Sequence, residues 1–253
     1  MPRTRPVLAL LFNAFVWGCS WWPLRALNAA GLHPLWATAL VYLAVLFVLV
    51  LALPQSARSL LRTPSLWLLA AAAGLTNICF NWAVTLGDVV RVVLLFYLMP
   101  AWSVLLAWWL LGERVTPMAL VRLVVALAGV VLVVLPPGAP LASLASGLSA
   151  TDFLAVAGGF CFALTNVLLR RLHAAPERER MLAMFAGGFV MAGAGAWAAT
   201  ALGLAPPPPA PAAGWLWVAA GLACAFLLGN LGLQYGAARL AAPRGEAERA
   251  TRE

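Results

Sequence analysis

Charged residues are scarce in this sequence of 253 residues: Asp, Glu, Lys and Arg make up 9% of it, whereas 64% of the residues are hydrophobic. Soluble domains carry roughly 25% charged residues, and about half of their residues are apolar. The composition therefore excludes a sizeable aqueous domain. Together with a mean hydropathy of +0.95, it predicts a protein that crosses the membrane many times.

Lysine is absent, so all 16 basic residues are arginines, and the net charge of +8 gives a pI near 10.6. In a soluble protein such a pI would suggest nucleic-acid binding. Here the arginines lie in short segments between apolar runs, where they indicate the orientation of membrane helices instead. We expect the lipid bilayer, and no nucleic acid, as a partner.

Cysteine and histidine are too few and too dispersed to suggest a metal or redox site. The four cysteines lie far apart inside apolar runs, without a CxxC motif, which indicates buried free thiols. His33 and His173 fall near predicted helix ends and have no partner at ligand spacing. We therefore expect no metal and no cofactor. No predicted span holds a cluster of His, Asp, Glu, Ser or Cys, so we also expect no enzyme activity.

Eight apolar runs are long enough to span a bilayer, which takes about 20 mostly apolar residues. The runs cover residues 7–25, 35–53, 66–86, 89–111, 117–136, 150–170, 181–204 and 214–237. Breakers such as Pro54 and Asp88 separate them, and Thr116-Pro117 has the pattern of an N-cap followed by a first-turn proline. The predicted fold class is an all-α polytopic membrane protein with eight transmembrane helices.

The arginines distribute very unevenly between the two sides of this predicted topology. If the N-terminus is cytoplasmic, fourteen arginines lie on the cytoplasmic side, and only Arg25 and Arg91 lie outside. Cytoplasmic loops carry the excess of basic residues in membrane proteins. We therefore predict a multi-pass protein of the plasma membrane, the inner membrane of a bacterium, with both termini in the cytoplasm.

The helix pattern is written twice along the chain. The first predicted helix aligns with the sixth at an offset of 146, which places Arg25 on Arg171, and the third aligns with the eighth at an offset of 149, which places Asn81 on Asn230. Five helices separate the copies, so equivalent helices cross the membrane in opposite directions. Such inverted repeats are typical of secondary transporters, whose substrate site lies near the bilayer midplane between the two halves.

Two short motifs strengthen this interpretation. Trp17-Gly18 lies within the first predicted helix, and the fourth contains Leu95-Phe96-Tyr97-Leu98-Met99-Pro100 and ends in Gly112-Glu113. A proline in mid-helix followed by an apolar run ending in Gly-Glu resembles the EamA-type transporters of the drug/metabolite transporter superfamily. The resemblance implies ten helices in two repeats of five, with the fourth and ninth helices forming walls of a central cavity.

The second copy is shorter than the resemblance implies. We predict a first repeat of five helices at residues 7–136, a second repeat of three helices at 150–240, and a charged cytoplasmic tail at 241–253, which is too polar to span a membrane. The expected function is export of a small metabolite or drug-like amphipathic solute by alternating access. The alternative is an inactive carrier remnant, or a structural membrane subunit that needs a partner or self-association as a homodimer.

Polar side chains inside membrane spans are the first candidates for function, because they are costly to bury in lipid. The predicted lining of the solute cavity comprises Asn13, Trp17, Trp21, Asn77, Asn81, Tyr97, Asn166, Asn230 and Gln234. Amides and indoles that face a shared cavity can bind a solute by hydrogen bonds and stacking. For each amide, interhelical packing is an equally good interpretation.

Pro100 is predicted to kink the fourth helix, because proline removes a backbone hydrogen bond. The kink can serve as a hinge for alternating access or be a static bend. Gly112 and Glu113 form the family motif at the cytoplasmic end of the same helix, where we expect Glu113 to anchor the loop by pairing with an arginine.

Overall fold

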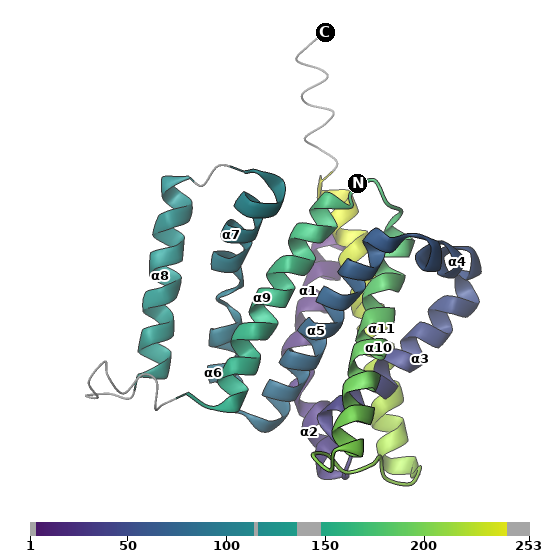
Figure 1. Cartoon of the computed structure of the whole chain (residues 1–253). Helices are drawn as coiled ribbons and strands as arrows, with labels where there is room; N and C mark the ends of the chain where they lie inside the picture. The colour runs from purple at the N-terminus through teal and green to yellow at the C-terminus, as the bar shows by residue number, and fades with distance from the viewer. Residues whose placement is uncertain (1–3, 114–115, 136–147, 242–253) are drawn as a thin grey trace.

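The computed structural model describes residues 4–113, 116–135 and 148–241, and these residues form a bundle of α-helices without β-strands (Figure 1). Seven helical segments of this part of the chain are long and apolar enough to cross a membrane, and an eighth apolar helix is shorter. The expected all-α membrane fold is therefore confirmed. The predicted tail after Ala241 lies outside the described residues.

The helices follow one another with short connections. In chain order they are α1 (Thr4–Cys19), α2 (Trp21–Ala29), α3 (Pro34–Ala52), α4 (Pro54–Arg62), α5 (Pro64–Leu86), α6 (Val89–Phe96), α7 (Met99–Leu111), α8 (Pro117–Val134), α9 (Ala150–Arg171), α10 (Glu177–Ala201) and α11 (Ala213–Ala241). The first span consists of α1 and α2, the fourth consists of α6 and α7, and α8 is the shorter apolar helix.

Local sequence signals explain where several helices begin and end. The imidazole of His33 caps α3, the hydroxyl of Thr116 caps α8, and Ser149 with Asp152 forms a capping box at the start of α9. These side chains accept hydrogen bonds from backbone N–H groups that have no partner inside the helix. At the other end of a helix, Gly112 adopts the left-handed conformation (φ 68°) that stops α7.

Two spans are interrupted by prolines. In the first span the helix breaks at Ser20, three residues before Pro23, and in the fourth it breaks at Tyr97–Leu98, just before Pro100. A proline ring clashes with the carbonyl four residues earlier and offers it no N–H group, so the distortion lies on the N-terminal side of the proline. The bend predicted at Pro100 is thus centred two to three residues earlier.

The segment after Pro54 forms a helix, α4, where the apolar pattern predicts only a break between spans. Figure 1 shows α4 lying across the ends of the neighbouring spans rather than along them. Leu60 is buried there, whereas Arg58 and Arg62 are exposed. This segment is too short and too polar to register as an apolar run, but its apolar and basic residues fall on opposite faces of a helix.

The tightest packing joins α3, α5 and α10. A Cβ added to Gly187 would lie 1.8 Å from the carbonyl oxygen of Ala70, and one added to Gly188 would lie 2.1 Å from the ring of Tyr42. Small residues let membrane helices approach closely, which drives their association through van der Waals contact. These glycines therefore let α10 approach α5 and α3 at the centre of the bundle.

The remaining spans flank this centre in two pairs. α1 packs against α11, and α9 packs against α5, while α3 and α10 contact each other. Figure 1 shows α1 and α5 running in one direction and α9 and α11 in the opposite one. A repeat that relates α1 to α9 and α5 to α11 with inversion predicts this arrangement, since it makes the two pairs equivalent.

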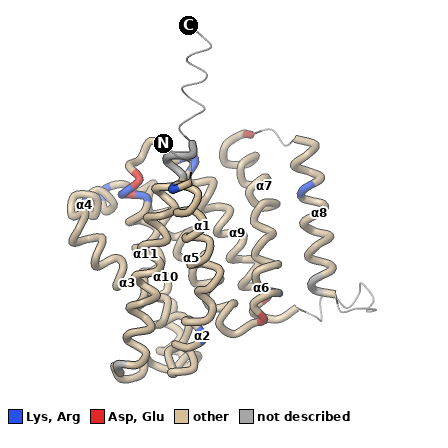
Figure 2. The backbone as a smooth tube through the Cα atoms, turned by 180° about the vertical axis from the view of Figure 1, so that it is seen from behind, with Lys and Arg blue, Asp and Glu red and all other residues tan. Residues whose placement is uncertain are grey.

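Charged residues lie near the two ends of the bundle (Figure 2). Arg25 is on α2 and Arg91 is at the start of α6, both at the same end. The arginines of α4, of the end of α9 and of the start of α10 lie at the opposite end. The strong bias in arginine placement along the sequence is therefore also a bias between the two ends of the structure.

Candidate functional site

Polar side chains of α3 and α5 meet in two successive contacts. The Asn81 amide donates to the hydroxyl of Thr38 over 3.2 Å, and the Tyr42 hydroxyl donates to the amide oxygen of Asn77. Thr38 and Tyr42 are four residues apart, as are Asn77 and Asn81, so each pair lies on one helix face. Because α3 and α5 are antiparallel, the two pairs are in register and form a polar ladder.

Three of the four residues in the polar ladder are closed to solvent, and Asn77 is half-buried. Asn81 is 0% exposed, and Thr38 and Tyr42 are 2% exposed. The amide oxygen of Asn81 has no hydrogen-bond partner in the described part of the chain. A buried acceptor without a donor costs roughly 1–3 kcal/mol. This oxygen is therefore a position where a hydrogen-bond donor from outside the chain would be stabilised.

A second group of predicted residues lies between α1 and α11. The rings of Trp17 and Phe226 stack with centroids 4.6 Å apart, and the Gln234 amide donates to the oxygen of Asn230 over 3.0 Å. The amide oxygen of Asn13 is buried and lacks a partner among the described residues. It lies 3.4 Å from where a Cβ on Gly229 would be, so Asn13 faces α11.

Tyr42 connects the two groups. Its ring lies edge-on to Phe226 at 5.9 Å between centroids, while its hydroxyl bonds to Asn77. Trp17, Phe226, Tyr42 and Asn77 thus form a continuous row, here called the aromatic–amide row, across α1, α11, α3 and α5. Sequence reasoning missed Thr38 and Tyr42. The pattern that could have identified them is a threonine and a tyrosine one turn apart in the span with the highest mean hydropathy.

Trp21 and Asn166 are not part of the aromatic–amide row. Trp21 packs against the hydrophobic core, and the Arg25 guanidinium lies 5.5 Å from the centre of its ring, which is within cation–π distance. Asn166 is half-buried on α9. The structure therefore joins Trp17 to Asn77 through Phe226 and Tyr42, and it bonds Asn81 to Thr38 on the same face of α3. Asn166 lies on α9, outside these contacts.

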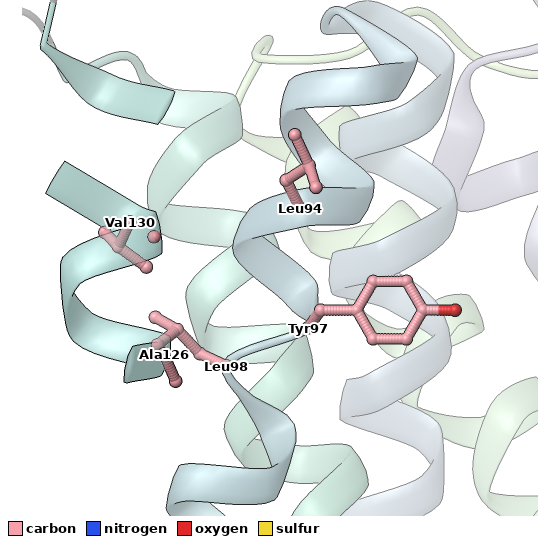
Figure 3. A pocket seen from close by; sticks show the side chains of 6 residues that line it. Leu94, Tyr97, Leu98, Ala126 and Val130 are labelled. Carbon is pink, nitrogen blue, oxygen red and sulfur yellow. The ribbon is translucent and has the colours of Figure 1, made fainter. Parts of the chain in front are cut away.

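Tyr97 lies at the interruption between α6 and α7, and 58% of it is exposed. A hollow of about 220 Å³ next to it is lined by Leu94, Tyr97, Leu98, Ala126, Gly129 and Val130. In Figure 3 the Tyr97 ring points away from Ala126 and Val130 of α8. Apart from the phenol at its rim, this hollow is apolar, so it offers few groups that could orient a polar solute.

The interruption at Pro100 is held against α9. A Cβ added to Gly159 would lie 2.6 Å from the carbonyl oxygen of Phe96, the carbonyl that Pro100 cannot bond. The rings of Phe96 and Phe162 lie 5.5 Å apart, and those of Trp102 and Phe160 lie 5.7 Å apart. Gly159 thus lets α9 contact the broken backbone directly. The hinge role of Pro100 stays a prediction.

Polar contacts fix the ends of these helices. The Arg91 guanidinium makes two bonds of 2.8 Å to the carboxylate of Asp152, whose side chain is 1% exposed. Arg25 donates to the backbone oxygens of Val84 and Gly87 at the end of α5. These arginines join α6 to α9 and α2 to α5 at one end of the bundle.

Glu113 of the Gly112-Glu113 motif pairs with Arg170 over 3.0 Å at the opposite end of the bundle. The side chains of both partners are 50% exposed, and such exposed pairs contribute only about 0–1 kcal/mol. Glu113 therefore contacts the end of α9. Within the described ranges, no group of three or more His, Cys, Asp and Glu residues is placed to hold a metal ion.

Comparison with known proteins identifies one family. The sequence profile of the EamA-like transporter family matches residues 4–135, slightly more than half of the chain. This region runs from α1 to the residue that directly follows α8, and it includes the interrupted fourth span. No curated protein and no solved structure showed significant similarity. With its multiple membrane-spanning helices, the chain belongs to the EamA-like transporter family, the membrane transporters of the drug/metabolite superfamily.

Proposed function

We propose that this chain exports a small amphipathic solute, a metabolite or a drug-like compound, across the plasma membrane by alternating access. The observation that carries the proposal is the match of residues 4–135 to a family of transporters. The multi-pass helical bundle supports it, because transport of a solute requires a path through the membrane. Members of this family are transporters rather than enzymes.

The aromatic–amide row supports an amphipathic solute. Trp17, Tyr42 and Phe226 provide apolar and aromatic surface, and the amide oxygens of Asn13 and Asn81 are buried acceptors without donors among the described residues. A solute with an apolar body and a hydroxyl or amine group would satisfy both features. Hydrogen bonds that fill unpaired acceptors also give strong discrimination against analogues that lack the donor.

Burial of Asn81 and Tyr42 supports alternating access. Asn81 and Tyr42 are closed to solvent, so a solute can reach them only if the helices around them separate. The α1–α11 pair and the α5–α9 pair are the related units that would move against one another. Rocking of repeat units around a fixed midplane site is the usual way in which inverted-repeat transporters alternate between their two open states.

Arginine placement supports the orientation. The end of the bundle with α4 and the start of α10 carries most arginines of the described residues, and Arg25 and Arg91 lie at the other end. By the bias toward basic residues on the cytoplasmic side, we assign the α4 end to the cytoplasm. Both chain termini then lie inside the cell.

Transport assays on alanine variants test this proposal. The chain is expressed in a bacterial strain without its own drug exporters, and growth is followed against a panel of amphipathic amines and alcohols. We expect N81A and N230A to reduce the resistance that the unsubstituted chain gives. T76A is the matched control, since Thr76 is also buried on α5 but bonds only to Ala72 of its own helix.

The outcomes separate the alternatives once membrane abundance of each variant has been measured. Equal resistance from N81A, N230A and T76A would show that the amides of Asn81 and Asn230 do not bind the solute. If the unsubstituted chain is abundant in the membrane but moves no compound, in cells or in proteoliposomes, the alternative of an inactive carrier or a structural subunit is favoured instead.

A further inference from the structure

One face of α4 is fixed to the bundle. Leu60 is buried, and Leu53 and Ala57 pack against the same hydrophobic core. Positions 53, 57 and 60 recur at helical spacing and therefore share a face. α4 contacts α10, α3 and α5 through this face, and it lies across the ends of the spans (Figure 1). Its orientation relative to the membrane plane is thus set by the fold.

The opposite face of α4 carries two arginines. Arg58 and Arg62 are one helical turn apart, and both are exposed. In the part of the chain that the structure describes, neither forms an ion pair or a side-chain hydrogen bond. Two guanidinium groups are therefore held side by side with their charges uncompensated by protein groups.

Apolar side chains on α4 and just after it place this helix at the depth of the lipid headgroups. Leu61 is 73% exposed, and Trp67 is 54% exposed. The indole N–H of Trp67 donates to the backbone oxygen of Leu60 over 3.0 Å. Exposed tryptophans near the ends of spans lie at the membrane–water interface. Arginines on the same short helix then reach the level of the lipid phosphates.

The start of α10 adds further charges beside α4 (Figure 2). Arg178 is exposed, and Arg180 donates from one guanidinium nitrogen to the backbone oxygen of Leu169 over 3.2 Å. The Nε atom of Arg180 is buried without a partner among the described residues. Glu177 and Glu179 lie in the same first turn. Four arginines against two glutamates leave this surface positive.

We propose that Arg58, Arg62, Arg178 and Arg180, here called the α4–α10 basic patch, bind the phosphate group of an anionic phospholipid. The planar guanidinium group matches phosphate with two parallel hydrogen bonds. Leu61 and Trp67 lie beside the arginines, so a ligand that has an acyl chain and glycerol backbone next to its phosphate fits better than a free phosphate ion. The site is independent of the proposed solute cavity.

Binding of phosphatidylglycerol tests the proposal. The full-length chain is purified in a mild detergent, and its thermal unfolding is followed as phosphatidylglycerol or phosphatidylcholine is added. We expect phosphatidylglycerol to raise Tm and phosphatidylcholine not to. Each arginine near an anionic lipid surface increases affinity about fivefold. R58Q/R62Q should therefore raise the half-saturating phosphatidylglycerol concentration about 25-fold.

R122Q is the matched control, because Arg122 is exposed on α8, at the edge of the bundle away from α4. It removes the same kind of charge and should leave phosphatidylglycerol binding unchanged. An equal loss in R122Q would show that only overall charge matters and would overturn the proposal. If R58Q/R62Q does not fold, the single variant R62Q should still weaken binding about fivefold.

A further arm distinguishes lipid from free phosphate. Glycerol phosphate, which has no acyl chains, should not raise Tm at concentrations where phosphatidylglycerol does. Equal stabilisation by the two would contradict a lipid site. Native mass spectrometry provides the direct count, with at least one phosphatidylglycerol retained by the unsubstituted chain and by R122Q, and lost from R58Q/R62Q.

Discussion

α1 and α9 are the helices that the predicted repeat relates to each other, yet they are buried to different extents. In the most apolar window of each span, 44% of the α9 residues are buried, against 11% for the span that begins with α1. α9 contacts α5, α6 and α7, whereas α1 has one extensive contact, with α11. The two helices run in opposite directions, as the predicted repeat requires, but they differ in how many neighbours they contact.

Side-chain size at the contact positions explains the difference. At the repeat offset of 146, Gly158 and Gly159 of α9 correspond to Phe12 and Asn13 of α1. Gly159 lets the backbone of α6 approach α9, and Gly158 lets α5 approach it, while Phe12 is exposed together with Leu8, Leu11 and Phe15. α9 is thus shaped for close helix contact, and α1 turns an apolar side outward, as is usual for a surface in contact with lipid.

The largest effect on stability is expected when the ion pair at the start of α9 is removed. R91L removes both bonds to Asp152 and leaves a carboxylate that is 1% exposed without its charged partner. Removing one partner of a buried pair costs about 3–5 kcal/mol. Here we expect the lower end of this range, because Ser149 still donates to Asp152. Chemical denaturation in detergent measures the change.

The matched variant on the α1 side is R25L. Arg25 donates to uncharged backbone oxygens of Val84 and Gly87, so R25L leaves no buried charge without its partner. We therefore expect a smaller loss in R25L than in R91L. A larger loss in R25L would mean that the α1–α2 span, despite its exposure, is the more firmly attached of the two.

The next largest effect on stability is expected from a methyl group added to α9, compared with one added to α1. G159A places a Cβ 2.6 Å from the carbonyl oxygen of Phe96, so the backbone must move, and overpacking of this kind costs about 1–3 kcal/mol. A Cβ on Gly18 of α1 meets nothing within 4 Å, so G18A should not lower the stability. Thermal unfolding of the purified variants checks this. Equal Tm values for the two would refute close packing as the origin of the difference.

Removal of one oxygen atom weakens the link that Tyr42 makes between the α1–α11 pair and the α3–α5 pair. Y42F removes the hydroxyl that bonds to Asn77, while it retains the ring that contacts Phe226. A hydrogen bond contributes about 0.5–1.5 kcal/mol net, so we expect a loss of about 1 kcal/mol in unfolding free energy. Y97F is the control, since Tyr97 is 58% exposed. An unchanged free energy in Y42F would show that the polar ladder adds no stability.

The smallest effect concerns pH at the helix caps. α9 is capped by a serine hydroxyl, whereas α3 is capped by the imidazole of His33, which accepts the N–H of Leu35 over 3.3 Å and can do so only when its Nδ1 is unprotonated. Burial lowers the pKa of His33. The unfolded chain therefore takes up the proton first as the pH falls below about 6.5.

Stability should consequently be complete above that pH and decline as the pH falls from about 6.5 toward the lower pKa of the folded imidazole. Measurements of Tm between pH 5 and 8 test this, with H33N as the control, since an asparagine cap does not titrate in this range. If H33N retains the same pH dependence, a group other than His33 is responsible.

The sequence was sufficient to predict the spans and their class, because apolar length and arginine placement report directly on the bilayer. It also located most breaks between helices, from Pro54 to the Thr116-Pro117 start of α8. The profile match to residues 4–135 confirms the resemblance that was based on Pro100 and the Gly112-Glu113 pair. These are local or periodic signals, which a single sequence carries in full.

Contacts between distant segments were not predictable in the same way. Arg91 meets Asp152 across 61 positions, and Tyr42 meets Asn77 across 35. A single sequence has no record of which helices become neighbours, so Thr38 and Tyr42 looked like ordinary members of an apolar span. Asn77 and Asn81 were recognisable as polar residues of a span, but their common partner helix, α3, was not.

The interruption of the fourth span also has an electrostatic consequence. Helix ends carry about half an elementary charge, negative at the C-terminus and positive at the N-terminus. Where α6 ends at Phe96 and α7 begins at Met99, two such partial charges of opposite sign lie close together between the apolar halves of one span. A polar spot is thereby created inside the membrane region by backbone atoms alone, without an acidic or basic side chain.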